Sequence, residues 1–240
     1  MQIQEFSHQF SSLLNSYAIS PEFGHSSSPT TVELDEYEKS LFLTNAQEDL
    51  ALSLYNGRNS SGLSFEETEE LRRYLSPLVK EAELSPISST SGNPIGMGSK
   101  SKFFTLPEDL WFITYESVSI SDGACEGNTS LDVYPVRQDE YNRIKKNPFR
   151  GANDRRALRL DLSEGNIEII CKYTVTKYYL RYLRQLSPII LVTLEDDTQL
   201  RGEKTPMTSE LPESLHLKIL QRAVEMALAS RGYTRNNNRE

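Results

Sequence analysis

The chain has 240 residues, with 34 Asp and Glu against 26 Lys and Arg, and a formal net charge of -8 at pH 7. This length suits one large domain or two small ones, and the negative charge argues against a protein whose whole surface grips nucleic acid. The first residues lack the pattern of a secretion signal, no apolar run is long enough for a membrane span, and the cysteines form no close pair. We therefore expect no membrane partner, no disulfide framework and no zinc site, and a reducing cytosol as the compartment.

Residues 1–84 have mainly helical periodicity and form a predicted N-terminal helical region. A first helix is expected up to residue 20, followed by a Ser-, Pro- and Gly-rich linker over residues 21–31. Residues 35–55 are predicted to form two helical segments, because Thr44 and Gln47 have the spacing of a capping box. A second such pair, Ser64 and Glu67, predicts a helix over about residues 65–75.

The composition changes after residue 84. Residues 85–102 are almost all small or polar, and we expect a flexible loop because such a segment buries too little apolar area to offset its ordering entropy. Residues 103–210 are predicted to be mainly β, since short β-branched and aromatic runs recur there and residues 163–166 have the character of a hairpin turn. The runs cover residues 110–120, 130–137, 157–162, 166–172, 173–182 and 189–194.

The clearest predicted element is a C-terminal helix over residues 211–232. Pro212 suits its first turn, Gly232 suits its end, and its apolar residues cover so wide an arc that we expect it to be buried against the rest of the protein. Residues 233–240 are polar and are predicted to form a disordered tail. The predicted fold class is α+β, with N-terminal helices, a mostly antiparallel β region and a buried C-terminal helix.

A search for catalytic patterns returns none, so we predict no catalytic, cofactor-binding or metal-binding residues, no cofactor and no enzymatic activity. The three histidines have no partner at metal-ligand spacing, and His216 falls in the apolar arc of the last helix, as a core histidine would. The run around Gly98 lacks the spacing of a phosphate loop. Paired carboxylates such as Asp139 and Glu140 fit turns or helix starts. An unrecognised hydrolase is the least favoured interpretation.

Charge is divided unevenly along the chain. Residues 33–83 carry 12 Asp and Glu against 5 Lys and Arg, whereas residues 142–159 carry 7 Lys and Arg against the single Asp154. Complementary patches raise encounter rates and fix the relative position of two partners, so we hypothesise that copies of the chain assemble with one another. The candidate interface residues are Arg143, Lys145, Lys146, Phe149, Arg150, Arg155, Arg156, Glu66, Glu67 and Glu70.

The basic run over residues 141–150 has three interpretations. It begins like a short helix and closes in an Asn-Pro turn that places Phe149 beside basic groups. It could be a solvated loop, an interface anchor with a basic rim, or a site that contacts DNA phosphates.

Several segments together resemble the head-to-tail connector, or neck ring, proteins of crAss-like tailed bacteriophages. The matching stretches are residues 34–55 (LDEYEKSLFLTNAQEDLALSLY), 65–78, 106–113 (LPEDLWFI), 139–150 (DEYNRIKKNPFR), 159–161, 179–191 and 210–230 (ELPESLHLKILQRAVEMALAS). They cover more than half of the chain in the expected order, and none is a catalytic signature.

The resemblance implies a structural virion protein that forms a homo-oligomeric, twelvefold ring beneath the portal. Its partners would be other copies, the portal protein and further neck or tail proteins, with DNA passing through the channel without sequence-specific contact. It would be assembled in the cytoplasm of the bacterial host. The alternative that we keep is a DNA-binding accessory protein that uses the basic loop over residues 142–159.

Overall fold

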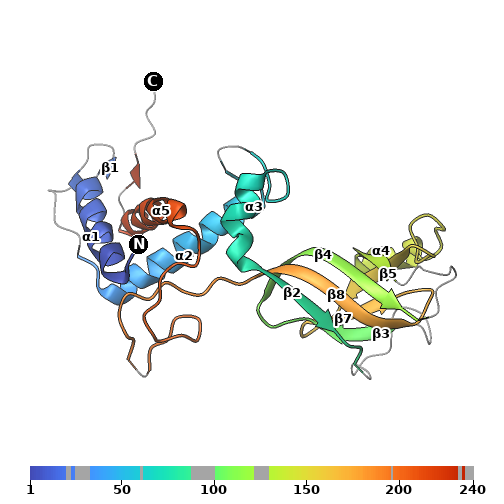
Figure 1. Cartoon of the computed structure of the whole chain (residues 1–240). Coiled ribbons are helices and arrows are strands. Elements are labelled where there is room, and N and C mark those ends of the chain that lie inside the picture. Colours follow the sequence, from blue (N-terminus) through green and yellow to red (C-terminus); the bar gives the residue numbers. More distant parts are fainter. Residues whose placement is uncertain are drawn as a thin grey trace. The chain divides into compact units, whose positions relative to one another are not determined.

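A computed structural model describes residues 1–19, 23–24, 33–59, 62–87, 101–121, 130–195, 197–231 and 234–235. The chain divides into two compact units, which are described separately (Figure 1). Unit 1 consists of Met1–Pro77 and Leu186–Glu240, and unit 2 is Leu78–Gln185. Most of the predicted linker and flexible loop, and the end of the predicted tail, lie outside the described residues.

Unit 1 is built on α1 (Ile3–Ile19), α2 (Glu36–Tyr55) and α5 (His216–Ser230), which is preceded by η2 (Glu213–Leu215). The helix α5 packs against both α1 and α2 (Figure 1). From the end of η2 through α5, the buried positions come in adjacent pairs every four residues: Leu215, His216, Ile219, Leu220, Ala223, Val224, Ala227 and Leu228. The predicted buried C-terminal helix is therefore confirmed, although Leu217 on this helix is 52% exposed.

The helix α2 is one continuous element, so the predicted break at Thr44 and Gln47 is wrong. Its capping box is formed instead by Asp35, which caps the first turn, and Glu38. Thr44 and Gln47 are buried in mid-helix, where their side chains bond to a distant segment of the chain. Local spacing alone had assigned these polar residues to a cap.

A polar stripe on α2 holds the backbone of residues 187–191. Ser40 Oγ accepts a hydrogen bond from Leu191 N at 3.0 Å, and Thr44 Oγ1 accepts one from Ile189 N at 3.0 Å. Thr44 Oγ1 also lies 3.3 Å from Ile189 O, and Gln47 Nε2 donates to Ser187 O at 2.9 Å. Because residues at i, i+4 and i+7 share one face of a helix, the three side chains bond along an extended segment much as a neighbouring strand would.

This packing explains why residues 189–194 are not the strand that we predicted. Within them Ile190 makes an isolated β-bridge to Met207, and Ile190, Leu194 and Leu200 form a small apolar cluster. The chain then reverses in a tight turn at Arg201 and Gly202, both of which have positive φ, and Arg201 forms an ion pair with Glu48 of α2. In the described part of the tail, β9 (Thr234–Arg235) pairs antiparallel with β1 (Phe23–Gly24), in contrast to the disorder predicted there.

The helix α3 (Glu69–Leu75) begins later than predicted. Its N-cap is Thr68, whose side chain accepts a hydrogen bond from Leu71 N at 3.3 Å. The Ser64 and Glu67 pair forms a turn ahead of the helix, in which the Glu67 carboxylate accepts from Ser64 N. A 3-10 turn, η1 (Ser76–Leu78), follows and leads into unit 2.

Unit 2 contains a seven-stranded sheet and the helix α4 (Gln138–Ile144). The strand order is β2-β8-β4-β5-β6-β7-β3, and all neighbours are antiparallel except β5 and β6, which confirms the mostly antiparallel prediction. The strands are β2 (Val79–Leu84), β3 (Lys102–Thr105), β4 (Leu110–Ile120), β5 (Ser130–Pro135), β6 (Arg156–Asp161), β7 (Asn166–Ile170) and β8 (Val175–Arg184). The predicted hairpin turn joins β6 to β7, with Glu164 and Gly165 at positive φ.

The sheet is curled, because its two edges approach each other. Ile87, just after β2, forms a bridge with Phe103 of β3, and Ile87 N donates to Phe103 O at 2.8 Å. On the inner face the rings of Phe104 and Tyr178 lie 5.5 Å apart, in a core that draws residues from all seven strands. On the outer face α4 covers β6 and β7 through the buried Tyr141, which packs on Leu158, Leu160 and Ile170.

Candidate interaction surface

The basic run begins on α4, whose position on the sheet is fixed by Tyr141. This residue is 2% exposed, whereas Arg143, Lys145 and Lys146, at the end of the helix, are exposed. Arg143 pairs with Glu140 at 3.1 Å within the helix, and Lys145 Nζ lies 5.6 Å from the centre of the Tyr141 ring. Packing of Tyr141 on the core thus leaves three cations exposed at the end of the helix.

The loop after α4 is held in one conformation by its own hydrogen bonds. Asn147 Oδ1 accepts from Phe149 N at 2.9 Å and from Arg150 N at 3.3 Å, and Gly151 N donates to Asn147 O at 2.8 Å. A Cβ atom at Gly151 would lie only 2.9 Å from Asn147 O, so this close approach requires glycine. The turn presents Phe149 with its side chain 84% exposed.

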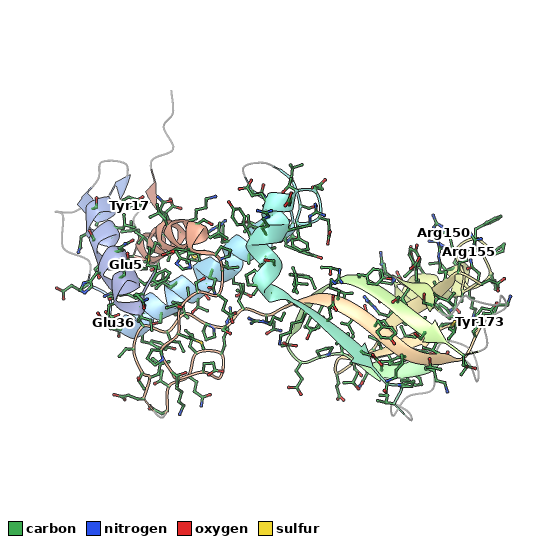
Figure 2. The ribbon with its side chains drawn as sticks, in the orientation of Figure 1. Glu5, Tyr17, Glu36, Arg150, Arg155 and Tyr173 are labelled. Atoms are coloured by element: carbon green, nitrogen blue, oxygen red, sulfur yellow. The ribbon has the colours of Figure 1, made fainter. Side chains whose placement is uncertain are left out.

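Arg156 fastens this turn to the sheet. Its Nη1 donates to Phe149 O at 3.0 Å, and its guanidinium lies 4.2 Å from the centre of the Tyr134 ring. We define the Phe149 loop as residues 147–156. Arg150 and Arg155, both exposed, lie on this loop (Figure 2). A cation stacked on an aromatic ring resists displacement better than a solvated one, so Arg156 serves here as a structural tie.

The predicted basic residues differ in whether a carboxylate forms an ion pair with them. Over the described residues, no carboxylate pairs with Lys145, Lys146, Arg150, Arg155 or Arg156, whereas Arg143 has Glu140 as an ion-pair partner. Asp154, the single acid of the run, accepts from Lys172 Nζ at 2.6 Å and from Tyr173 OH at 2.7 Å, and these bonds lower the pKa of its carboxyl group. The net positive charge of the loop is therefore presented to solvent.

The predicted acidic residues belong to unit 1. Glu66 and Glu67 lie in the turn before α3 and Glu70 lies in its first turn, and all three are exposed. Backbone bonding from Ser64 lowers the pKa of Glu67, and Tyr74 OH donates to Glu70 at 2.6 Å. Both charged groups predicted from the sequence thus lie on the surface, one on each unit.

A buried network in unit 2 escaped the sequence analysis. Arg159 Nη1 lies 2.8 Å from both carboxylate oxygens of Glu116, to which Tyr178 OH also donates at 2.7 Å, and Arg159 Nε contacts Asp161 at 2.9 Å. Burial raises the pKa of Glu116, and burial next to that carboxylate raises the pKa of Tyr178. Because these groups satisfy one another, the network ties β4, β6 and β8 together and presents no reactive group.

Neither a metal centre nor a membrane span is found in the described part of the chain. Among those residues, no group of three or more His, Cys, Asp or Glu could hold a metal ion. None of the described helices is both long and apolar enough to cross a membrane.

Comparison with known proteins gives the chain its family. Residues 1–239 match the family described as phage tail ring protein 3/4. The chain belongs to this family of phage ring proteins. It is 46% identical over 231 residues to Ring protein 3 of Bacteroides phage crAss001, which covers 95% of each chain. It is also 29% identical over 239 residues to Ring protein 4/5 of the same phage, covering 96% of this chain and 93% of the relative.

Membership confirms the resemblance to crAss-like phage ring proteins that the sequence indicated. The relatives are named ring proteins, and a chain of this family is a structural ring protein of the tail or neck of a phage. This role agrees with an exposed aromatic residue on the loop after α4 and with opposite charges on the surfaces of the two units.

Proposed function

We propose that this chain is the subunit of a homo-oligomeric ring in the head-to-tail connector of a tailed bacteriophage. The ring would join portal to tail, line the passage for DNA, and have twelve copies to match the portal. It would assemble in the host cytoplasm and become part of the virion. The observation that carries this proposal is the Phe149 loop, together with the family of the chain.

An ordered loop that displays an aromatic side chain suits an assembly interface. Truncation studies find that aromatic and Arg anchors dominate binding energy, and a loop fixed before binding loses less conformational entropy. The Phe149 loop is fixed by Asn147 and by Arg156, and its anchor is 84% exposed. Its basic neighbours would add the charge complementarity that sets the register of one copy on the next.

We further propose that the basic helix end meets the acidic turn before α3 across a subunit boundary. Replacing Arg143, Lys145 and Lys146 together by Glu should weaken ring formation, and reversing Glu66, Glu67 and Glu70 to Lys in the same chain should partly restore it. Three changes are combined because single exposed ion pairs contribute only about 0–1 kcal/mol. Native mass spectrometry of the purified chain, alone and with portal protein, measures the ring population.

Two outcomes would count against this function. Assembly that is unaffected by the triple reversal at low salt would exclude the proposed charge contact. Tight binding of the isolated protein to duplex DNA, weakening with a log-log salt slope of about -0.9 per neutralised phosphate, would favour the DNA-binding alternative that the exposed basic side chains keep open.

A further inference from the structure

The outer face of the curled sheet has a groove that α4 leaves uncovered. It has a volume of about 410 Å³, and its lining residues come from β2, β8 and β4. These three strands are adjacent in the sheet (Figure 1). Its lining residues are Glu81, Ala82, Glu83, Tyr115, Tyr179, Leu180 and Arg181. This surface had no signal in the sequence, because its residues come from strands far apart in the chain.

The register of the strands explains the hollow. One cross-strand row consists of Glu81, Arg181 and Tyr115, and the next row on the same face consists of Glu83, Tyr179 and Ser117. Ser117 is small and 8% exposed, so the surface is low at this position of β4, next to the rings of Tyr115 and Tyr179. The result is a depression with aromatic walls, with Glu81 and Glu83 along its β2 side.

Both aromatic walls are accessible. Tyr115 is 53% exposed and Tyr179 is 37% exposed, which is high for aromatic residues in the middle of a sheet. Glu81 binds Arg181 at 2.5 Å and Glu83 binds Lys177 at 2.8 Å. A carboxylate has about four lone-pair sites, so each can accept a further cation.

We infer that this groove receives Phe149 from a second copy of the chain. The loop and the groove are complementary in two respects. Phe149 supplies an exposed ring that needs an apolar, aromatic site, and Arg150 and Arg155 beside it supply charge opposite to that of Glu81 and Glu83. Edge-to-face or offset contacts between aromatic rings add to the free energy of burial.

The inference deepens the proposed ring function and rests on it. Phe149 and the groove are different surfaces of the same unit, so one copy would offer its loop to the groove of the next. Such a head-to-tail contact is heterologous, and heterologous contacts generate rings when the rotation between copies closes. The contact therefore predicts the type of symmetry that a ring protein needs.

A photo-cross-linker placed at the anchor tests the contact directly. Phe149→p-benzoylphenylalanine keeps an aromatic side chain in the loop, and irradiation of the assembled ring should link it to peptides of β2, β8 or β4 from another copy. The same amino acid at Thr105, an exposed position on β3, is the matched control and should give no link to these strands.

Truncation gives a second readout. Phe149→Ala and Tyr179→Ala should each weaken assembly about 30-fold or more, as expected for anchor residues. The double variant should be little worse than either single one, because both changes remove the same contact. Phe149→Tyr should retain assembly, and the melting temperature of the free Phe149→Ala subunit should be unchanged.

The possible failures are distinguishable. If rings form but position 149 links only to unit 1 or to another virion protein, the groove is not its site and the inference is wrong, while the proposed ring function stands. If the chain forms no ring either alone or with portal protein, the proposed function itself fails, and the inference with it.

Discussion

His216 lies in the buried stripe of α5 and is 5% exposed. Its Nε2 is 3.0 Å from Leu211 O, and its ring packs against Phe6 with the ring centres 5.2 Å apart. The sequence had placed this residue in the core because of its helical position, and the structure agrees. Burial lowers the pKa of the imidazole, because the charged form would lose its hydration there.

This lowered pKa predicts how stability depends on pH. The unfolded chain has an ordinary histidine pKa of about 6.5 and binds more protons than the folded chain just below it. The stability contributed by His216 is therefore complete above about pH 6.5 and is lost as the pH falls towards the folded pKa. In urea unfolding between about pH 7.5 and about pH 5, His216→Gln should show a shallower loss of stability than the wild type.

The exposed His8 on α1 provides the matched control. His8→Gln makes the same chemical change at a solvent-exposed position, so it controls for the substitution itself. Equal slopes for all three proteins would show that burial of His216 does not govern proton binding.

Arg159 shows that the exposure of a single side chain cannot always be predicted from the local sequence. It ends the same basic run as Arg155 and Arg156, yet its side chain is only 11% exposed. The reason is its inward position in β6, where it meets Glu116 from a strand 43 residues earlier in the chain. Exposure of Phe149 could be expected from its Asn-Pro turn, but such long-range pairing leaves no local signal.

Among the elements, α2 shows that side chains which form long-range hydrogen bonds can have the spacing of a local capping motif. Thr44 and Gln47 are spaced as a capping box, but in the structure they and Ser40 bind residues 187–191. Removing the hydroxyl group of Thr44 would leave Ile189 N unpaired in a buried site. An unsatisfied buried donor costs about 1–3 kcal/mol.

We therefore predict that Thr44→Val destabilises unit 1 by about 1–3 kcal/mol, although Val has nearly the same shape. The measurement is urea unfolding followed by far-ultraviolet circular dichroism. Asn45, an exposed neighbour on the same helix, supplies the control: the difference between Asn45→Thr and Asn45→Val reports helix propensity alone. A Thr44→Val effect no larger than that difference would mean that the stripe does not hold the segment.

Two strands show why element boundaries were only partly predictable. The bounds expected for β4 match those observed, because its apolar and aromatic residues dominate the pattern. The strand β2 was assigned to the helical region instead, since Lys80, Glu81 and Glu83 give it the composition of a solvated helix end. On an edge strand, however, charged residues on the outer face are ordinary, and they pair with β8.

At the scale of the whole molecule, the fold class was predictable but the division into units was not. Unit 1 is discontinuous, and unit 2 is inserted between its two parts. Helical and β periodicity identified the two kinds of structure. They could not show that residues 186–211 return to the helices, because this segment is held there by side chains of α2 rather than by a pattern of its own.

The insertion predicts that unit 2 folds independently. Val79 of β2 and Leu183 of β8 are register partners, and Gln185 N donates to Asp109 O at 2.7 Å, so the two ends of the unit lie side by side. It also has its own core and its own helix. Domains with adjacent ends and an independent core can fold alone.

Residues 78–185 expressed alone should therefore unfold cooperatively in urea and give a dispersed amide nuclear magnetic resonance spectrum. A shorter piece, residues 78–174, lacks β8, which pairs with β2 on one side and with β4 on the other, so it should remain unfolded. Joining residue 77 to residue 186 through a linker of about 4–6 residues should in turn leave a helical unit 1.

Residues 78–185 carry both the Phe149 loop and the groove, so they should compete with the full chain for assembly if the proposed contact exists. A fragment without cooperative unfolding would show that unit 2 depends on unit 1 for its stability, contrary to the independence inferred from its separate core.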